Sequence, residues 1–516
     1  MAHSRVFAAV ALGLVLSLRA AAGSPDAVAA LEAKARQGDP AAQFDLSKRL
    51  HEGDGVAKDL AQALLWEQRA AEGGWALAQN ARGVTFETGR GVAADAAEAV
   101  KWYRRAAEQG LDGGQYNLGR MYLAGAGVAQ DDREAAKWMR FAAEQGLKEA
   151  QYYLGVSLLL GNGVAVDERE GVTWLRRAAE RGYPPAEVQL GMCFASGSGV
   201  QEDPREAIRW YRLAAEHGSA EGHYHLGKCY LHGRGVAKDE AEAMRSFRRA
   251  SELGNTDSLV DIGVMYSHGE GVPVDEQEAV KWYRLAAEQG NANGQLNLGV
   301  SYEHGESVAK DEREAAKWYR LAAEQGNAAA QLNLGLALVT GRGVPEDPRA
   351  GTDWFRRSAE QGNAQAQYLL GKAHATGFGA SKDAAEALRW LRRGAEGGYA
   401  KAQLELGERY AAGAGLPRDG REAIHYLLLA GGQGNVRALF RLGELYANGD
   451  GVERDEREAF VSYSLAAALG DRESAVLRDR LAAKWPPATQ AAAREEAARR
   501  LAELRTTTGG AGTATP

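Results

Sequence analysis

The segment KWYRLAAEQG at residues 281–290 occurs again, letter for letter, at residues 317–326. The two copies are 36 residues apart, and the same step recurs along most of the chain. A sequence that repeats itself at a fixed period of about 20–50 residues is typical of proteins that stack one small structural unit many times. The period therefore decides the fold. A short motif that recurs with this period is a structural part of the repeat.

Glycine, aspartate and tryptophan mark equivalent positions in the successive units. A Gly-x-Gly-Val turn places its second glycine at the same position in eleven of twelve units, and Ser307 takes that position in the other unit. These glycines are Gly55, Gly91, Gly127, Gly163, Gly199, Gly235, Gly271, Gly343, Gly379, Gly415 and Gly451. An aspartate follows four residues later in all twelve units, from Asp59 to Asp455. Nine of the eleven tryptophans also share one position, which chance cannot produce.

Each unit is predicted to form two helices. In residues 327–362, Asn327 is the expected N-cap, and apolar residues follow at helical spacing as far as Leu338. Gly341 and Gly343 are expected to end this helix, because a left-handed backbone is needed there. Asp347 should cap the second helix. In ten units a glutamate follows this aspartate by three residues, which predicts a capping box in which each side chain binds a backbone N–H.

Small residues on both helices predict close packing between the units. Leu118, Gly119 and Tyr122 place an apolar residue, a gap and an aromatic ring on one face of the first helix, and Ala106-Ala107 permits close approach on the second. The glycine should let a neighbouring helix come close, with tyrosine and tryptophan filling the space. One such pair cannot bury its apolar face alone, so neighbouring pairs must stack into an α-solenoid.

The pattern A-x-x-x-L-G-x-x-Y-x-x-G-x-G-V-x-x-D-x-x-x-A-x-x-W-x-x-x-A-A-x-x-G resembles the Sel-1-like repeat, a relative of the tetratricopeptide repeat. The resemblance covers about Asp39 to Gly470 and implies an all-α fold, a right-handed α-solenoid of twelve 36-residue helix-turn-helix repeats with helical caps. Departures predict locally looser packing. They are Ser47 and Ser307, which replace glycines, and Ser246 and Ser462, which replace the tryptophan.

The ends of the chain differ from the repeats. Val6 to Leu18 is an apolar run after Arg5, and Ala20 to Ala22 offer a cleavage site, which together predict a secretory signal peptide; an uncleaved anchor or a chance apolar terminus is the alternative. A periplasmic or secreted protein is therefore expected. The predicted boundaries are 1–22 signal peptide, 23–38 N-terminal capping helix, 39–470 twelve repeats, 471–505 C-terminal capping helices and 506–516 disordered tail.

The charge and hydropathy of the sequence indicate which classes of partner are not expected to bind. The net charge is −7 with both signs mixed along the chain, which argues against nucleic acid and anionic membranes as partners. No apolar stretch after the signal segment is long enough to cross a bilayer. No cofactor is predicted.

A few residues of the sequence could in principle bind a metal, form a disulfide, bind phosphate or catalyse a reaction. His225, Cys229 and His232 share one helix stripe, but the first and last are about 10 Å apart, too far for one zinc ion. Cys193 lies one repeat before Cys229, too far for a disulfide.

Gly233-Arg234-Gly235 lacks the rest of a phosphate-binding loop. Ser307 and Lys310 match S-x-x-K of β-lactamases, but no S-D-N or K-T-G accompanies them. Neither a metal site nor a catalytic site is predicted.

The concave surface is the remaining candidate site. If stacking follows the tetratricopeptide pattern, first helices line it, and its residues vary while the framework does not. Tyrosine and arginine suit peptide surfaces, and asparagine can pair with an extended backbone. The candidate partner-binding residues are Tyr116, Asn117, Arg120, Tyr152, Tyr153, Tyr224, His225, Asn297, Asn333 and Tyr368.

The resulting hypothesis is a non-catalytic adaptor that is exported to the periplasm and holds a protein or peptide ligand in the concave groove. For the surface, the alternative is a solvated polar face without a ligand. For the protein, the alternatives are a lumenal adaptor of the eukaryotic secretory pathway and a β-lactamase-like hydrolase.

Overall fold

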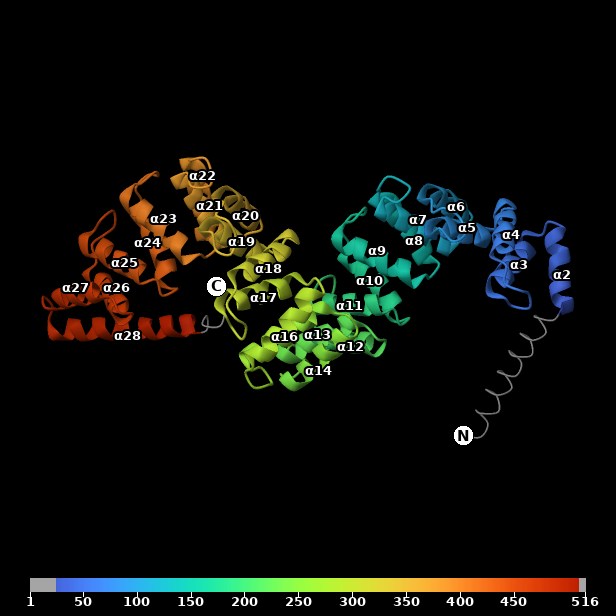
Figure 1. The fold of residues 1–516 in the computed structure, drawn as a ribbon. Coiled ribbons are helices and arrows are strands. Elements are labelled where there is room, and N and C mark those ends of the chain that lie inside the picture. The colour runs from blue at the N-terminus through green and yellow to red at the C-terminus, as the bar shows by residue number, and fades with distance from the viewer. Residues whose placement is uncertain (1–24, 510–516) are drawn as a thin grey trace, which may run out of the picture. The chain divides into compact units, whose positions relative to one another are not determined.

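The structure, a computed structural model, describes residues 25–509. Over this range the chain consists of helices and turns and contains no strand (Figure 1). Pairs of helices follow one another in chain order, which confirms the predicted all-α solenoid. The predicted signal peptide, residues 1–22, lies outside the described residues.

Twelve helix pairs form the body of the protein. The first helices are α3 (Pro40–Glu52), α5 (Ala76–Thr88), α7 (Asp112–Ala124), α9 (Lys148–Leu160), α11 (Pro184–Ser196), α13 (Ala220–His232), α15 (Thr256–His268), α17 (Ala292–His304), α19 (Ala328–Thr340), α21 (Ala364–Thr376), α23 (Ala400–Ala412) and α25 (Val436–Asn448). The second helices are α4 (Leu60–Glu72), α6 (Ala96–Glu108), α8 (Asp132–Glu144), α10 (Glu168–Ala179), α12 (Pro204–Glu216), α14 (Glu240–Glu252), α16 (Glu276–Glu288), α18 (Glu312–Glu324), α20 (Pro348–Glu360), α22 (Ala384–Glu396), α24 (Gly420–Gly431) and α26 (Glu456–Ala468).

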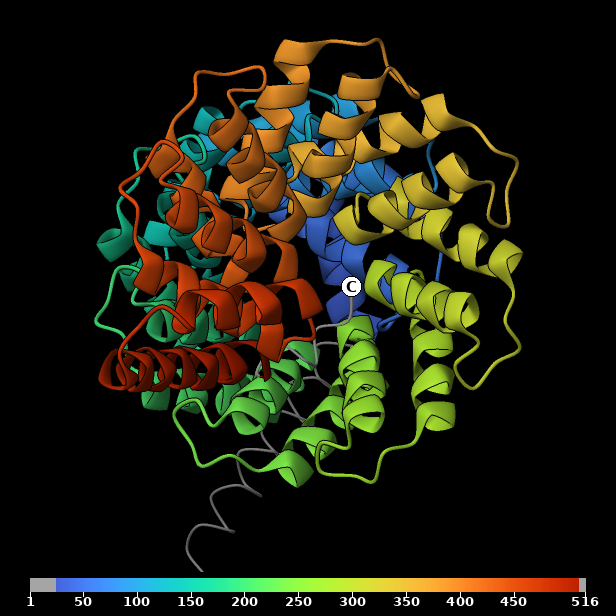
Figure 2. The same ribbon diagram turned by 90° about the vertical axis from the view of Figure 1, so that its left-hand side faces the viewer.

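The pairs belong to two compact units, residues 1–258 and 259–516. Within each unit a first helix packs on the second helix of its own pair, as α21 does on α22, and a second helix packs on the next first helix. The helices coloured yellow to red in Figure 2 follow one another in this way. Some successive first helices also contact each other, as α5 and α7 or α23 and α25 do, whereas successive second helices of the described chain make no comparable contact. First helices therefore line the inner side of the stack in each unit.

The aspartates cap the second helices as predicted, but the capping box is wrong in one half. Asp95 Oδ1 accepts from the backbone N–H of Ala97 and Glu98, and the equivalent aspartate accepts in all twelve pairs, from Asp59 to Asp455. The backbone N–H of Asp95 already donates to the carbonyl of Phe86. The Glu98 carboxylate is therefore not needed there and instead accepts from Lys101 Nζ.

In six of the turns the second glycine is required by the backbone of the preceding repeat as well as by its own left-handed conformation. Gly343 has φ 68°, and a Cβ atom there would overlap the carbonyl oxygen of Glu312 at the start of α18, one repeat earlier. Ser307 has φ 55° and is the one non-glycine residue with positive φ in the described range. The turn at Ser307 therefore keeps the shape of the others at a conformational cost.

The packing of glycine against an aromatic ring follows the prediction. A Cβ atom on Gly299 of α17 would lie 2.7 Å from Cε1 of Tyr319 on α18, so only glycine leaves room for the ring. The tryptophans lie at the joints between pairs: Trp174 packs among Met139 and Leu154 of the preceding second helix and its own first helix. Tyrosine thus fills the space within a pair, and tryptophan fills the space between pairs.

A ladder of buried glutamines joins the pairs, and it was not predicted. Gln331 Nε2 donates to the carbonyl of Ala323 at 3.2 Å, and Gln361 Nε2 donates to Gln331 Oε1 at 2.8 Å. The first of these bonds recurs in eight pairs. The donors are Gln43, Gln79, Gln115, Gln151, Gln295, Gln331, Gln367 and Gln403. Each buried amide thereby ties the end of one second helix to the next first helix.

Helices α2 (Pro25–Arg36), α27 (Arg472–Ala482) and α28 (Pro487–Gly509) lie at the ends of the described chain. The carbonyl of Ala35 in α2 accepts from Gln43, as a second helix would. Helix α28 packs on α26, where Arg500 binds Glu458 through two hydrogen bonds of 2.8 Å. α28 continues past Leu504 to Gly509, and Thr506 Oγ1 donates to the carbonyl of Glu503. The expected tail is therefore helical over 506–509, and residues 510–516 lie outside the described range.

Candidate functional site

A cluster of tyrosines lies on the first helices α7 and α9 in the unit of residues 1–258. The ring centroids of Tyr116 and Tyr153 are 6.1 Å apart, those of Tyr152 and Tyr153 are 5.3 Å apart, and Tyr183 contacts Tyr152 edge-on at 5.6 Å. All four side chains are half-buried. We call these four residues the tyrosine cluster. It presents aromatic area with polar tips on the inner side of the stack.

Polar neighbours hold the edge of the tyrosine cluster. The Arg120 guanidinium lies 5.9 Å from the centre of the Tyr116 ring, donates to Asn117 Oδ1 and forms a 2.9 Å ion pair with Glu87. Burial, followed by the nearby groups, raises the pKa of Tyr183 to about 12. Burial also raises the pKa of Tyr116 and Tyr152. These three phenols therefore remain neutral hydrogen-bonding groups at physiological pH.

Tyr224 and His225 form a separate aromatic group on α13. The His225 ring stacks on Tyr211 with centroids 4.8 Å apart and planes 15° apart, and it meets Tyr224 edge-on at 5.5 Å. Burial lowers the pKa of His225, so the imidazole is neutral at pH 7. His225 acts here as an aromatic surface that also carries polar nitrogens.

The three remaining candidate residues lie in the unit of residues 259–516. Asn297 on α17 and Asn333 on α19 are half-buried. The ring of Tyr368 on α21 packs against that of Tyr399, with centroids 5.3 Å apart and planes tilted by 51°. Burial and then Glu405 raise the pKa of Tyr368 to about 12. The ten predicted residues are thus divided between the units, and the structure brings five of them together around the tyrosine cluster.

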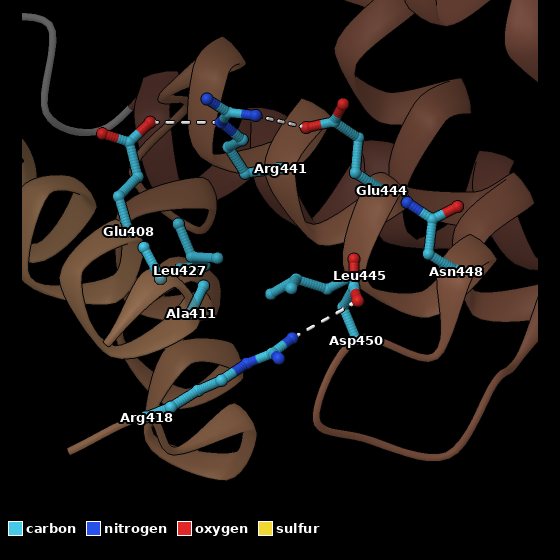
Figure 3. Close-up of a pocket in the computed structure, with 10 residues that line it drawn as sticks. Glu408, Ala411, Arg418, Leu427, Arg441, Glu444, Leu445, Asn448 and Asp450 are labelled. Atoms are coloured by element: carbon cyan, nitrogen blue, oxygen red, sulfur yellow. Dashed lines mark hydrogen bonds and ion pairs between the residues drawn. The ribbon is translucent and has the colours of Figure 1, made fainter. Parts of the chain in front are cut away.

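A charged pocket between α23 and α25 was missed by the sequence analysis. Arg441 lies between Glu408, at 3.2 Å, and Glu444, at 2.6 Å, while Arg418 approaches Asp450 at 3.3 Å (Figure 3). Leu427 and Leu445 line the cavity, whose volume is about 370 Å³. Both arginines that line the cavity are paired with carboxylates of the same chain. Neither arginine is therefore left unpaired to bind an anionic ligand.

Tyr183 was also missed, although the sequence carries a signal for it. It stands just before α11, where other repeats have a capping Ser, Asn or Asp, as at Asn327. Tyr183 makes no capping hydrogen bond, and its ring joins the tyrosine cluster instead. Tyr399 occupies the equivalent position just before α23, and its ring contacts Tyr368. A tyrosine at this cap position therefore accompanies a tyrosine pair in both repeats that have it.

The surroundings of the residues considered for metal binding or catalysis do not favour either chemistry. Across residues 25–509, no group of three His, Cys, Asp or Glu residues is arranged to hold a metal ion. Cys193 and Cys229 are free thiols, and burial raises the pKa of each to about 11. Ser307 is exposed in its turn, and Lys310 Nζ lies 3.4 Å from Glu312. No helix in the described part of the chain has the length and apolar character needed to span a membrane.

Twelve consecutive segments match the model of one protein family, the Sel1 repeat. The matched residues are 40–75, 76–111, 113–147, 148–183, 184–219, 220–255, 256–291, 292–327, 328–363, 364–399, 400–435 and 436–471. A comparison with curated proteins found no match.

Two solved structures resemble the chain over long alignments. The protein c5321, a protective antigen present in uropathogenic Escherichia coli strains and displaying an SLR fold, is 34% identical; the match covers 91% of this chain and 97% of that chain, with a TM-score of 0.52. A Sel1 repeat protein from Oxalobacter formigenes is 32% identical; the match covers 60% of this chain and 89% of that chain, with a TM-score of 0.46.

Proposed function

Because this chain belongs to the Sel1 repeat family, we propose that it is a non-catalytic adaptor that holds a protein or peptide ligand along its first helices. Sel1 repeat proteins are in general protein-interaction scaffolds, and the family resemblance inferred from the repeat pattern is confirmed. What is specific to this chain is the surface that makes the contact. We assign that surface to the inner side of the unit formed by residues 1–258.

The tyrosine cluster is the observation that supports this assignment. Four half-buried rings from α7, α9 and the start of α11 lie within 6.1 Å of one another in successive contacts. Tyrosine is enriched at the centres of protein interfaces because it offers a large apolar area and a hydrogen-bonding tip at little conformational cost. Burial raises the pKa of Tyr183 to about 12, so its phenol is neutral at physiological pH, whereas the pocket between α23 and α25 is already filled with ion pairs.

A differential pull-down tests the assignment. The chain beginning after the predicted signal peptide is immobilised and exposed to native envelope extract, in parallel with Tyr116→Ala/Tyr153→Ala and Phe141→Ala variants. Phe141 is a matched control because it is an aromatic residue of a second helix and is 41% exposed. Partners that are lost from the double variant but retained by Phe141→Ala support the assignment, provided that the melting temperatures agree. Equal capture by all three proteins contradicts it.

The location outside the cytoplasm is a second part of the proposal. It is supported by the apolar run Val6 to Leu18 and the small residues that follow it. Fractionation of cells that produce the full chain, with N-terminal sequencing of the product, tests it. A product in the periplasm or medium that begins near Gly23 is expected. A cytoplasmic product that retains its first residues would refute this part without affecting the contact surface.

The non-catalytic role has its own assay. Ser307 is exposed in a turn, and Lys310 lies close to Glu312, so neither has surroundings that would activate a serine nucleophile. Purified protein is expected to leave nitrocefin intact. Turnover that disappears in Ser307→Ala would overturn this part of the proposal.

A further inference from the structure

Two joints between helix pairs hold a carboxylate in the same way. In the first, Tyr103 Oη donates to Glu87 Oε2 at 2.5 Å, and Arg120 Nη2 donates to Glu87 Oε1 at 2.9 Å. In the second, Tyr319 Oη donates to Glu303 Oε2 at 2.6 Å, and Arg342 Nη1 donates to Glu303 Oε1 at 2.9 Å. In each joint a glutamate from the last turn of a first helix lies between a phenol of the second helix and an arginine of the next pair.

The joint between α11, α12 and α13 has the same surrounding groups but lacks the carboxylate. Tyr211 takes the place of the phenol, three repeats after Tyr103 and three repeats before Tyr319. Lys228 stands three repeats after Arg120, and Arg234 three repeats before Arg342, so both cation positions are basic here. Ala195 occupies the position of Glu87 and Glu303. This joint alone therefore combines the phenol with cations at both positions and an alanine between them.

A cavity of about 820 Å³ lies at this joint, and Ala195, Tyr211, Lys228 and Arg234 all line it. Its apolar walls include Pro204 and Ala207. We call it the α11–α13 cavity. Arg342 is held by Glu303, but Arg234 makes no ion pair with any residue of the described chain. The cavity thus occupies the space in which the other two joints hold their glutamate.

The charges of the α11–α13 cavity favour an anion. Lys228 and Arg234 are cationic, and Glu202 is the one carboxylate among the lining residues. Cys229 also lines the cavity, and burial raises its pKa to about 11, so the thiol is uncharged at neutral pH. His225 is neutral as described above. Cations therefore outnumber carboxylates among the lining residues, and the Tyr211 phenol is an additional hydrogen-bond donor.

We propose that the α11–α13 cavity binds a carboxylate supplied by another molecule, in the place that Glu87 and Glu303 fill at the other joints. The phenol of Tyr211 and the guanidinium of Arg234 donate to it, as Tyr319 and Arg342 donate to Glu303. The carboxylate is an acidic side chain or the free C-terminus of the polypeptide that lies along the first helices. That a polypeptide supplies it rests on the proposed function, whereas the preference of the cavity for a carboxylate does not.

Small probes test this preference without a known partner. N-acetylglutamic acid α-amide carries a side-chain carboxylate, and N-acetylglycine carries a C-terminal one; N-acetylglutamine amide and N-acetylglycinamide are their neutral counterparts. Binding of each to the chain is measured by saturation-transfer NMR at millimolar concentration. One or both acids should bind at least tenfold more tightly than the matching amides, and the tighter acid identifies the source. Equal binding of acids and amides, or no binding of either acid, overturns the proposal.

Three variants locate the binding. Ala195→Glu supplies the missing carboxylate internally, so it should raise the melting temperature by about 2–4 °C and abolish acid binding. Arg234→Gln should weaken acid binding at least tenfold while the fold is kept. Ala375→Glu is the matched control, because Ala375 is the equivalent residue of α21 and Leu391, Glu408 and Ala414 replace the phenol and both cations. Unchanged acid binding in folded Arg234→Gln, or equal effects of the two glutamate variants, would contradict the assignment.

Discussion

Arg82 Nη1 lies 3.6 Å from Glu67 Oε1, and both side chains are less than one-tenth exposed. This ion pair occupies a joint that is apolar elsewhere: Leu118 and Tyr103 stand at the equivalent positions one repeat later. Thr85 Oγ1 donates to Glu67 at 2.9 Å, and Ser47, where other repeats have glycine, lines the same pocket as Glu67. The looser packing predicted at Ser47 therefore coincides with a buried polar group that spans the first two repeats.

Removing one charge of this pair should be far more damaging than removing both. Arg82→Leu leaves the Glu67 carboxylate buried without its cation, so a loss of about 3–5 kcal/mol is expected. Glu67→Leu/Arg82→Leu restores the apolar joint and should be neutral or more stable than the parent by about 1–4 kcal/mol. Urea denaturation followed by hydrogen exchange in α4 and α5 measures both effects. A double variant as unstable as Arg82→Leu would show that the charged pair itself holds the joint.

Burial raises the pKa of Glu67 above the usual value of a glutamate, and this effect exceeds the opposing effects of the Thr85 hydrogen bond and the Arg82 charge. The folded state then binds the proton more tightly than the unfolded state. The contribution of Glu67 to stability is therefore present below the unfolded pKa and is lost as the pH rises through the folded pKa. Glu67→Gln should flatten the pH dependence of the unfolding free energy in that window. An unchanged slope in the variant would contradict the pKa shift.

Ser307→Gly should stabilise the protein by about 0.5–1 kcal/mol. A left-handed residue with a Cβ atom costs about 1–2 kcal/mol, and the greater chain entropy of glycine in the unfolded state offsets part of the gain. Gly343→Ser is the converse control and should be strongly destabilising, because its Cβ atom would overlap the Glu312 carbonyl. Thermal denaturation of the three proteins compares them. A lower melting temperature for Ser307→Gly would mean that the serine side chain makes a contact worth more than its strain.

The glutamine ladder should contribute measurably to the joints. Gln331→Ala removes the donor to the buried Ala323 carbonyl and the acceptor of Gln361, so a loss of about 1–3 kcal/mol is expected. Gln367→Ala is the matched control, since Gln367 donates to Ala359 but its Oε1 atom has no partner in the described chain. Its loss should be smaller by about 1 kcal/mol. Equal losses would show that the bond between the two glutamines adds nothing.

Local backbone rules made much of the fold predictable. Asp347 caps a helix, and Gly343 adopts a left-handed backbone, through interactions that begin with residues close in sequence, and the repetition of the unit makes both positions recognisable. The reciprocal half of the capping box failed for a non-local reason. The Asp95 N–H is taken by the Phe86 carbonyl, which only the close approach of the two helices brings near.

The sequence predicted which types of residue line the first helices, but not which of these residues lie close together. Tyr116 and Tyr153 were identified because they vary at inner positions of first helices, and they do meet. Asn297 and Tyr368 share that pattern but lie in the other compact unit. The pairing of Glu67 with Arg82 and the gap at Ala195 depend on residues from different helices, so neither is visible until the helices are packed.

Photo-crosslinking tests the central claim, that partners bind the inner side of the unit formed by residues 1–258, most directly. Benzoylphenylalanine is placed at Tyr153 in one protein and at Phe141, on the second helix α8, in the other, and both are irradiated in the cells that make them. Partner adducts are expected at position 153 and not at position 141. Adducts confined to position 141, or equally abundant at both, would contradict the account.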